Sequence, residues 1–67
     1  MPMVNVKITR EGATAEQKSQ VMAEMTEVLA RVLGKNPETT IVTIEEVETE
    51  NWGIDGQPVS ERRKQEV

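Results

Sequence analysis

The fold is decided by residues 14–34, TAEQKSQVMAEMTEVLARVLG, which predict one long amphipathic helix. Its apolar residues recur at intervals of three and four and form one stripe: Val21, Met22, Met25, Val28, Leu29, Val32 and Leu33. Thr14 is the expected N-cap, and Gln17 three residues later completes a capping-box pattern. Gly34 is the expected C-cap. Such a helix must bury its stripe against another element.

A strand pattern lies on each side of this helix. Residues 2–9 place Val4, Val6 and Ile8 on one face, which predicts a strand with that face on a core. Residues 39–47 are rich in Thr, Val and Ile and predict a second strand with apolar residues on both faces. A strand, a helix and a strand in this order predict a βαβ unit with a parallel pair.

The carboxy-terminal segment predicts a short hairpin followed by a tail. Residues 52–56, WGIDG, contain an Asp-Gly turn sequence, and the hairpin is expected to reach another subunit. Residues 61–67 contain the basic run Arg62, Arg63 and Lys64 between glutamates, and we expect a flexible, solvated tail there. The whole chain, residues 1–67, is predicted to be a single α+β domain.

The composition favours self-association. A chain of 67 residues buries only about 60% of the surface that its unfolded form exposes, so it is marginally stable alone. The sequence has no Cys and no His, which excludes disulfides and removes the usual ligands of a metal site. Oligomerisation is then the remaining way to stabilise a domain of this size.

The same composition limits the chemistry and the partners. Without His or Cys, catalysis must use carboxylates, Lys, Arg or the chain terminus. The net charge of −4 argues against binding nucleic acid, which requires clustered positive charge. No apolar stretch approaches the roughly 18 residues of a membrane span, and no signal peptide is visible. We therefore expect a cytoplasmic protein that binds neither nucleic acid nor membrane.

Pro2 is the most informative candidate for catalysis. Its small side chain permits removal of Met1, which would leave a free secondary amine at the terminus. Ordinary terminal amines titrate near about 7.7–8.0. Burial and nearby cations lower the pKa of such an amine, so that it can act as a base near neutral pH. The alternative interpretation is that Pro2 only begins an edge strand, where no backbone donor is needed.

Several segments, taken in order, resemble the 4-oxalocrotonate tautomerase family. They are PMVNVKI at 2–8, Glu11-Gly12, TAEQK at 14–18, Asn36-Pro37 and WGIDG at 52–56. The resemblance covers most of the chain. It implies a β-α-β unit with a closing hairpin, assembled as dimers of such units and often as hexamers. It also implies that the protein uses no cofactor.

The resemblance further implies roles for two residues. Pro2 would move a proton between oxygen and carbon of a 2-hydroxydienoate or another enol, giving the conjugated ketone. Trp52 matches the aromatic residue that walls the pocket and keeps the surroundings of the proline apolar, although Phe is commoner there. The alternative for Trp52 is packing in a core or an interface.

The chain also departs from the family pattern. Family members that act on dicarboxylates carry two arginines, at positions that correspond here to Ala13 and Val42. An extra residue before the helix places Arg10 ahead of Glu11, as in other members of the superfamily. Arg10 is therefore the predicted ligand of a substrate carboxylate, which a guanidinium binds as a bidentate fork. The alternative is an exposed arginine that pairs with Glu11 or with solvent.

Together these features predict a tautomerase of a small unsaturated acid that works as a homo-oligomer. One alternative keeps the proline but adds water to an unsaturated acid or removes halogen from it. That chemistry needs a group that activates water and strong carboxylate ligands, which the missing arginines disfavour. A second alternative is a non-catalytic binding module with the same fold.

Overall fold

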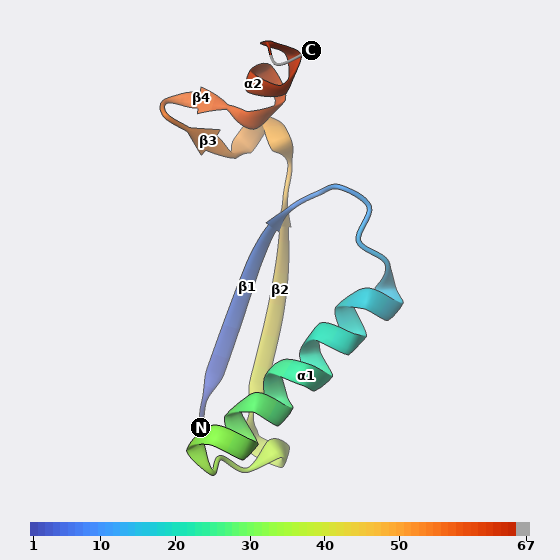
Figure 1. The fold of residues 1–67 in the computed structure, drawn as a ribbon, viewed down its shortest axis with the longest axis vertical. Coiled ribbons are helices and arrows are strands. Elements are labelled where there is room, and N and C mark those ends of the chain that lie inside the picture. The colour runs from blue at the N-terminus through green and yellow to red at the C-terminus, as the bar shows by residue number, and fades with distance from the viewer. Residues whose placement is uncertain (66–67) are drawn as a thin grey trace.

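A parallel pair of strands with one helix across it forms the centre of the molecule, which the computed structural model describes over residues 1–65. Strand β1 (Met3–Thr9) and strand β2 (Ile41–Val47) pair in register from Met3 opposite Ile41 to Thr9 opposite Val47. Helix α1 (Ala15–Leu33) connects them and lies across one face of the pair (Figure 1). The predicted β-α-β unit is confirmed.

Both ends of α1 are fixed by the residues that the sequence indicates. The Thr14 hydroxyl accepts a hydrogen bond from the Gln17 amide at 3.1 Å, and the Gln17 side chain accepts one from the Thr14 amide at 2.9 Å. These reciprocal bonds satisfy two amides that the first turn leaves free. Gly34 adopts a left-handed conformation with φ of 67° and ends the helix. No helix within residues 1–65 is long and apolar enough to cross a membrane.

Strand β2 begins two residues later than the sequence pattern predicts. A short 3-10 turn, η1 (Pro37–Thr39), precedes it. The Asn36 side chain accepts a hydrogen bond from the Glu38 amide at 2.9 Å, and Pro37 occupies the first position of the turn. An Asn cap followed by proline favours a helical turn over an extended start, because proline fixes φ at a helical value.

The predicted hairpin is confirmed at the far end of the chain. A second 3-10 turn, η2 (Thr49–Asn51), leads into β3 (Gly53–Ile54), which pairs antiparallel with β4 (Gln57–Pro58). The two central residues both have positive φ, 54° at Asp55 and 78° at Gly56. This is the conformation that a two-residue hairpin loop requires, and it explains the Asp-Gly sequence.

Residues 61–65 of the expected flexible tail at 61–67 are helical, and the flexibility of the segment stays a prediction. Helix α2 covers Val59–Gln65, and residues 66 and 67 lie outside the described residues. Val59 is 6% exposed, and its amide donates to the Trp52 carbonyl at 2.8 Å. An ion pair joins Arg63 to Glu11. The ion pair joins residues 52 positions apart, so the local charge pattern did not reveal it.

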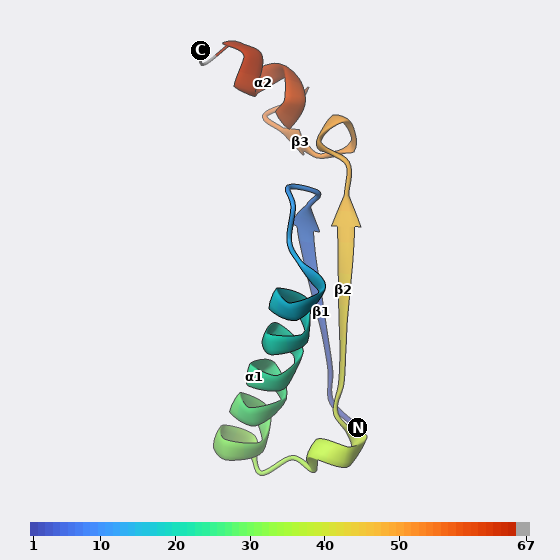
Figure 2. The same ribbon diagram turned by 90° about the vertical axis from the view of Figure 1, so that its right-hand side faces the viewer.

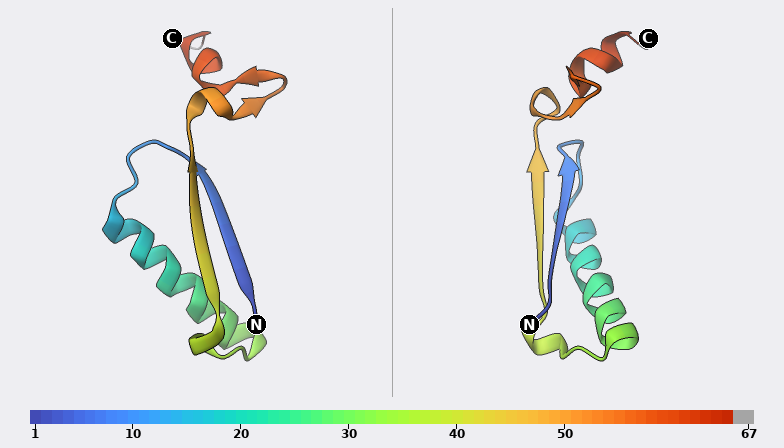
Figure 3. Two further views of the ribbon diagram at one scale, coloured as in Figure 1. Left: turned by 180° about the vertical axis from the view of Figure 1, so that it is seen from behind. Right: turned by 90° about the vertical axis from the view of Figure 1, so that its left-hand side faces the viewer.

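A single chain leaves much apolar surface uncovered. Its radius of gyration is 15.5 Å, whereas a compact chain of this length has about 11 Å. Figures 2 and 3 show α1 on one face of the strand pair and no element of residues 1–65 on the other. Met3 on that open face is 62% exposed, and Val32 on α1 is 63% exposed. The expectation of self-association therefore agrees with the shape of the subunit.

Candidate active site

Pro2 lies where β1 begins, beside the start of β2. Its carbonyl accepts a hydrogen bond from the Ile41 amide at 3.0 Å, and the residue is half-buried. Met1 is 90% exposed. The sheet thus fixes the direction of Pro2 through its carbonyl, while the preceding residue stands in solvent, where a peptidase can reach it.

Trp52 lies beyond the other end of the strands and lines two grooves. The large groove has a volume of about 590 Å³ and is lined by Lys7, Ile8, Thr9, Glu11, Gly12, Ala13, Gln17 and Trp52. The small groove has a volume of about 310 Å³ and is lined by Thr9, Trp52, Ile54, Val59, Arg62 and Arg63. A half-buried indole shared by two grooves agrees with a wall-forming position. The part of Trp52 in catalysis stays a prediction.

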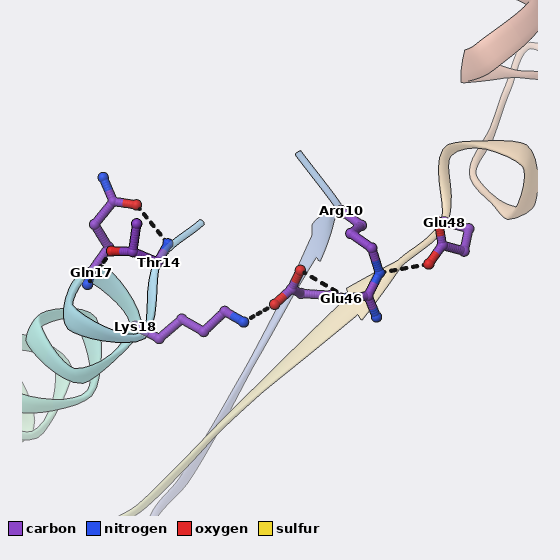
Figure 4. A network of polar contacts seen from close by, with 6 residues as sticks. All are labelled: Arg10, Thr14, Gln17, Lys18, Glu46 and Glu48. Atoms are coloured by element: carbon purple, nitrogen blue, oxygen red, sulfur yellow. Dashed lines mark hydrogen bonds and ion pairs between the residues drawn. The ribbon is translucent and has the colours of Figure 1, made fainter. Parts of the chain in front are cut away.

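Arg10 follows β1 directly, and two carboxylates hold its guanidinium. Its Nε lies 2.5 Å from Oε1 of Glu48, and its Nη1 lies 3.6 Å from Oε2 of Glu46 (Figure 4). Pairing with Glu11, the alternative that the sequence left open, is wrong. Arg10 lines neither groove. Its role toward a substrate stays a prediction.

Glu46 is the centre of this charged network. It faces α1 from β2, in the row of alternate residues that also contains Val42 and Ile44, and its side chain is only 12% exposed. Lys18 of α1 forms an ion pair with it from the other side (Figure 4). Glu46 is not among the site residues predicted from the sequence. The available indication was a carboxylate in a strand position where the alternation calls for an apolar residue.

A second ion pair ties α2 to the loop after β1. Glu11 accepts hydrogen bonds from Arg63 and from the Thr9 hydroxyl. The hydrogen bond from Arg63, followed by that from Thr9, lowers the pKa of the Glu11 carboxyl below its ordinary value. Because the pKa of Glu11 is lower in the folded protein than in the unfolded chain, the ion pair stabilises this arrangement at pH values above the ordinary pKa of glutamate. The contribution is lost as the pH falls through the lowered value.

The effect of this ion pair on the titration of Glu11 can be tested by substitution. Arg63→Gln is expected to raise the pKa of Glu11 toward the ordinary value of glutamate, because the main cause of the lowering is removed. NMR titration of the side-chain carboxyl carbon of Glu11 between about pH 2 and 7 measures this pKa directly. Arg31→Gln is a matched control, since Arg31 pairs with Glu27 on α1 and not with Glu11. An unchanged titration of Glu11 in Arg63→Gln would contradict the assignment.

The three predicted site residues do not meet within one chain. Pro2 precedes β1, and Trp52 follows β2, which runs parallel to it (Figure 1). Seven strand residues at about 3.3 Å each separate the two ends by roughly 20 Å. Arg10 shares an end of the molecule with Trp52, but its side chain is directed at Glu46 and Glu48. A site that contains both Pro2 and Trp52 therefore requires a second chain.

The two positions that lack the family's arginines contribute no charge. Ala13 lines the large groove, and Val42 faces α1. The cations beside Trp52 come instead from Lys7 in the large groove and from the arginines of α2 in the small groove. Those arginines are not among the predicted site residues, because they lie in the segment expected to be a solvated tail.

Comparisons with known proteins agree with this architecture. Residues 2–62 match the family model described as Tautomerase enzyme. A protein of Dickeya dadantii named Probable tautomerase K2 is 60% identical over 65 residues, which cover 97% of each chain. The crystal structure of DmpI from Helicobacter pylori has a TM-score of 0.88 at 35% identity and covers 94% of this chain and 97% of that one.

A second solved structure gives the same result. It belongs to the 4-oxalocrotonate tautomerase isozymes of Methylibium petroleiphilum, and it has a TM-score of 0.87 at 30% identity. The match covers 96% of this chain and 98% of the other. With this fold, and with a family match over nearly its whole length, the chain belongs to the tautomerase family, among the homologues of 4-oxalocrotonate tautomerase.

Proposed function

We propose that the protein is a cofactor-independent tautomerase that converts the enol of a small unsaturated acid, such as a 2-hydroxydienoate, into the conjugated ketone. The observation that carries this proposal is a proline directly after an exposed Met1, at the start of β1 in a chain of the tautomerase family. The relatives named tautomerase do not favour hydration, dehalogenation or a non-catalytic role.

Pro2 is the general base and then the general acid in this proposal. After removal of Met1, the neutral ring nitrogen accepts the proton of the enol hydroxyl as the carbonyl forms. The same nitrogen then returns that proton to a carbon of the conjugated chain, so no proton is gained or lost overall. The rigid ring and the hydrogen bond from Ile41 to the Pro2 carbonyl hold the nitrogen in one direction.

The proposed site is shared between chains. Pro2 of one copy and Trp52 of another would meet where the uncovered apolar surfaces pack together, and the indole would exclude water from the proline. The open face of the strand pair, with Met3 and Ile41 exposed, supports such an assembly. We propose a hexamer or a smaller assembly of dimers, acting in the cytoplasm.

Arg10 is the carboxylate ligand that the sequence suggests. To take that role, its guanidinium must exchange an interaction with Glu48 or Glu46 for the substrate. Glu48 is the partner more easily exchanged, because its side chain is 52% exposed and can be solvated when released.

Ketonisation of 2-hydroxymuconate and phenylenolpyruvate tests the proposal. Protein whose intact mass shows loss of Met1 is expected to accelerate both reactions. Protein that retains Met1 is expected to be inactive, because the Pro2 nitrogen is then a tertiary amide without a basic lone pair. Sedimentation of both forms checks that the assembly is the same. Equal rates in the two forms, or no acceleration by the processed protein, would refute the proline mechanism.

A further inference from the structure

The small groove beside Trp52 contains an arginine, Arg62, that has no carboxylate partner among the described residues. Arg62 lies on α2, is half-buried and lines this groove. Each of the other three arginines forms an ion pair: Arg10 with Glu46 and Glu48, Arg31 with Glu27, and Arg63 with Glu11. Among the described residues, no hydrogen bond or ion pair is found for Arg62. A cation that has lost part of its hydration without gaining a counter-ion favours an anionic ligand.

The other residues of the small groove indicate which class of anion would bind there. Trp52, Ile54 and Val59 supply an apolar wall, and no carboxylate of the described part of the chain lines the groove. Its volume of about 310 Å³ is near the lower limit of pockets that hold small molecules. A planar guanidinium matches a carboxylate as a two-pronged donor, and an indole face packs well on a flat conjugated chain. The groove is thus suited to a small unsaturated carboxylate.

We propose that Arg62 binds the carboxylate of the substrate and that Trp52 packs against its unsaturated chain. The inference rests on the proposed tautomerase function and supplies the cation that Ala13 and Val42 do not. Arg62 suits this role better than Arg10, because Arg10 must first give up a carboxylate of its own chain. Arg63 holds α2 in place through Glu11.

Binding can be measured without catalysis, because Trp52 is the only aromatic residue of the chain. Intrinsic fluorescence therefore reports directly on the groove. Fumarate is expected to change the emission in a saturable way, and its neutral analogue fumaramide is expected to have no effect. Arg62→Gln is expected to weaken fumarate binding about 10-fold or more, the usual effect of losing a charged hydrogen bond. Arg62→Lys keeps the charge but not the two-pronged geometry of the guanidinium. Its affinity for fumarate is expected to lie between those of the wild type and Arg62→Gln.

Arg31→Gln is the matched control, since it makes the same change of charge on the exposed surface of α1. It is expected to bind fumarate as the wild type does. Sedimentation of each variant verifies the assembly. The proposal would be overturned by wild-type affinity in Arg62→Gln, by equal weakening in Arg31→Gln, or by fumaramide binding as tightly as fumarate.

Kinetics separate this inference from the function on which it rests. With 2-hydroxymuconate, Arg62→Gln is expected to raise KM about 10-fold with little change in kcat, because the carboxylate contact exists before and during the reaction. A wild type that binds fumarate through Arg62 but does not ketonise enols would refute the tautomerase proposal alone. A wild type that ketonises enols, with fumarate binding unaffected in Arg62→Gln, would refute the role of Arg62 alone.

Discussion

Pro2→Ala is expected to lower the rate of enol ketonisation by about 10²-fold or more, within the range of 10²–10⁴ that general acid–base groups contribute. Alanine is also small enough to permit removal of Met1, so the variant keeps a terminal amine and loses the ring. The primary amine rotates freely, and the direction that the ring and the sheet impose on the nitrogen is lost. Initial rates with 2-hydroxymuconate and phenylenolpyruvate, on protein of verified mass, measure the effect.

A second substitution at the same position separates the ring from the amine. Pro2→Leu places a large side chain after Met1, so the methionine stays and the position keeps only an amide nitrogen. The rate of ketonisation is then expected to decrease by about 10⁴-fold, the upper end of the range for general acid–base groups. Pro37→Ala is a matched control, since Pro37 begins η1 and belongs to no part of the proposed site. Wild-type rates in Pro2→Ala, with the assembly intact, would show that the ring is not needed. Wild-type rates in Pro2→Leu would exclude the nitrogen of residue 2 as the base.

The parts of the fold that the sequence predicts are those determined by local interactions. Thr14 and Gly34 fix the ends of α1 through bonds to residues within one or two turns. The hairpin follows from two adjacent residues, Asp55 and Gly56, that tolerate positive φ. The parallel pair follows from the order of the elements, because two strands connected by one helix usually lie side by side and parallel.

The charged contacts were not predictable in the same way, because their partners are far apart in the sequence. Arg10 is held by Glu46 and Glu48, which no spacing rule connects to it. Helix α2 depends on Val59 and on the pair between Arg63 and Glu11, residues that lie 52 positions apart. The fold brings these three acidic residues and two arginines together.

The candidate site could not be predicted in full from the sequence for a further reason. Pro2 and Trp52 lie at opposite ends of the strand pair, so no contact within one chain joins them. A resemblance could assign them to one pocket, but only an assembly of chains can build it. Apart from the resemblance, the sequence indicated such an assembly mainly through size and composition, which is an argument about stability and not about which surfaces meet.

Glu46→Ala is expected to lower the free energy of unfolding by about 1–3 kcal/mol. The substitution leaves Lys18 with no ion-pair partner among the described residues and removes one of the two carboxylates that hold Arg10. The loss is smaller than the 3–5 kcal/mol of a fully buried pair, because the side chains of Lys18 and Arg10 are 31% and 56% exposed. Urea unfolding at a fixed concentration of chains measures it, since assembly also contributes to stability.

The neighbouring Glu45 provides the control for that measurement. It lies in the same strand on the open face, is exposed and accepts a hydrogen bond from Asn5 at 2.8 Å, so Glu45→Ala is expected to change stability by less than about 1 kcal/mol. The double variant Lys18→Met with Glu46→Met is expected to be more stable than Glu46→Ala, because neither end of the pair remains without its partner. Equal losses in Glu46→Ala and Glu45→Ala would show that the network stabilises α1 on the sheet no more than an exposed pair does. A double variant as unstable as Glu46→Ala would show that the loss comes from the missing carboxylate, which also contacts Arg10, and not from an unpaired Lys18.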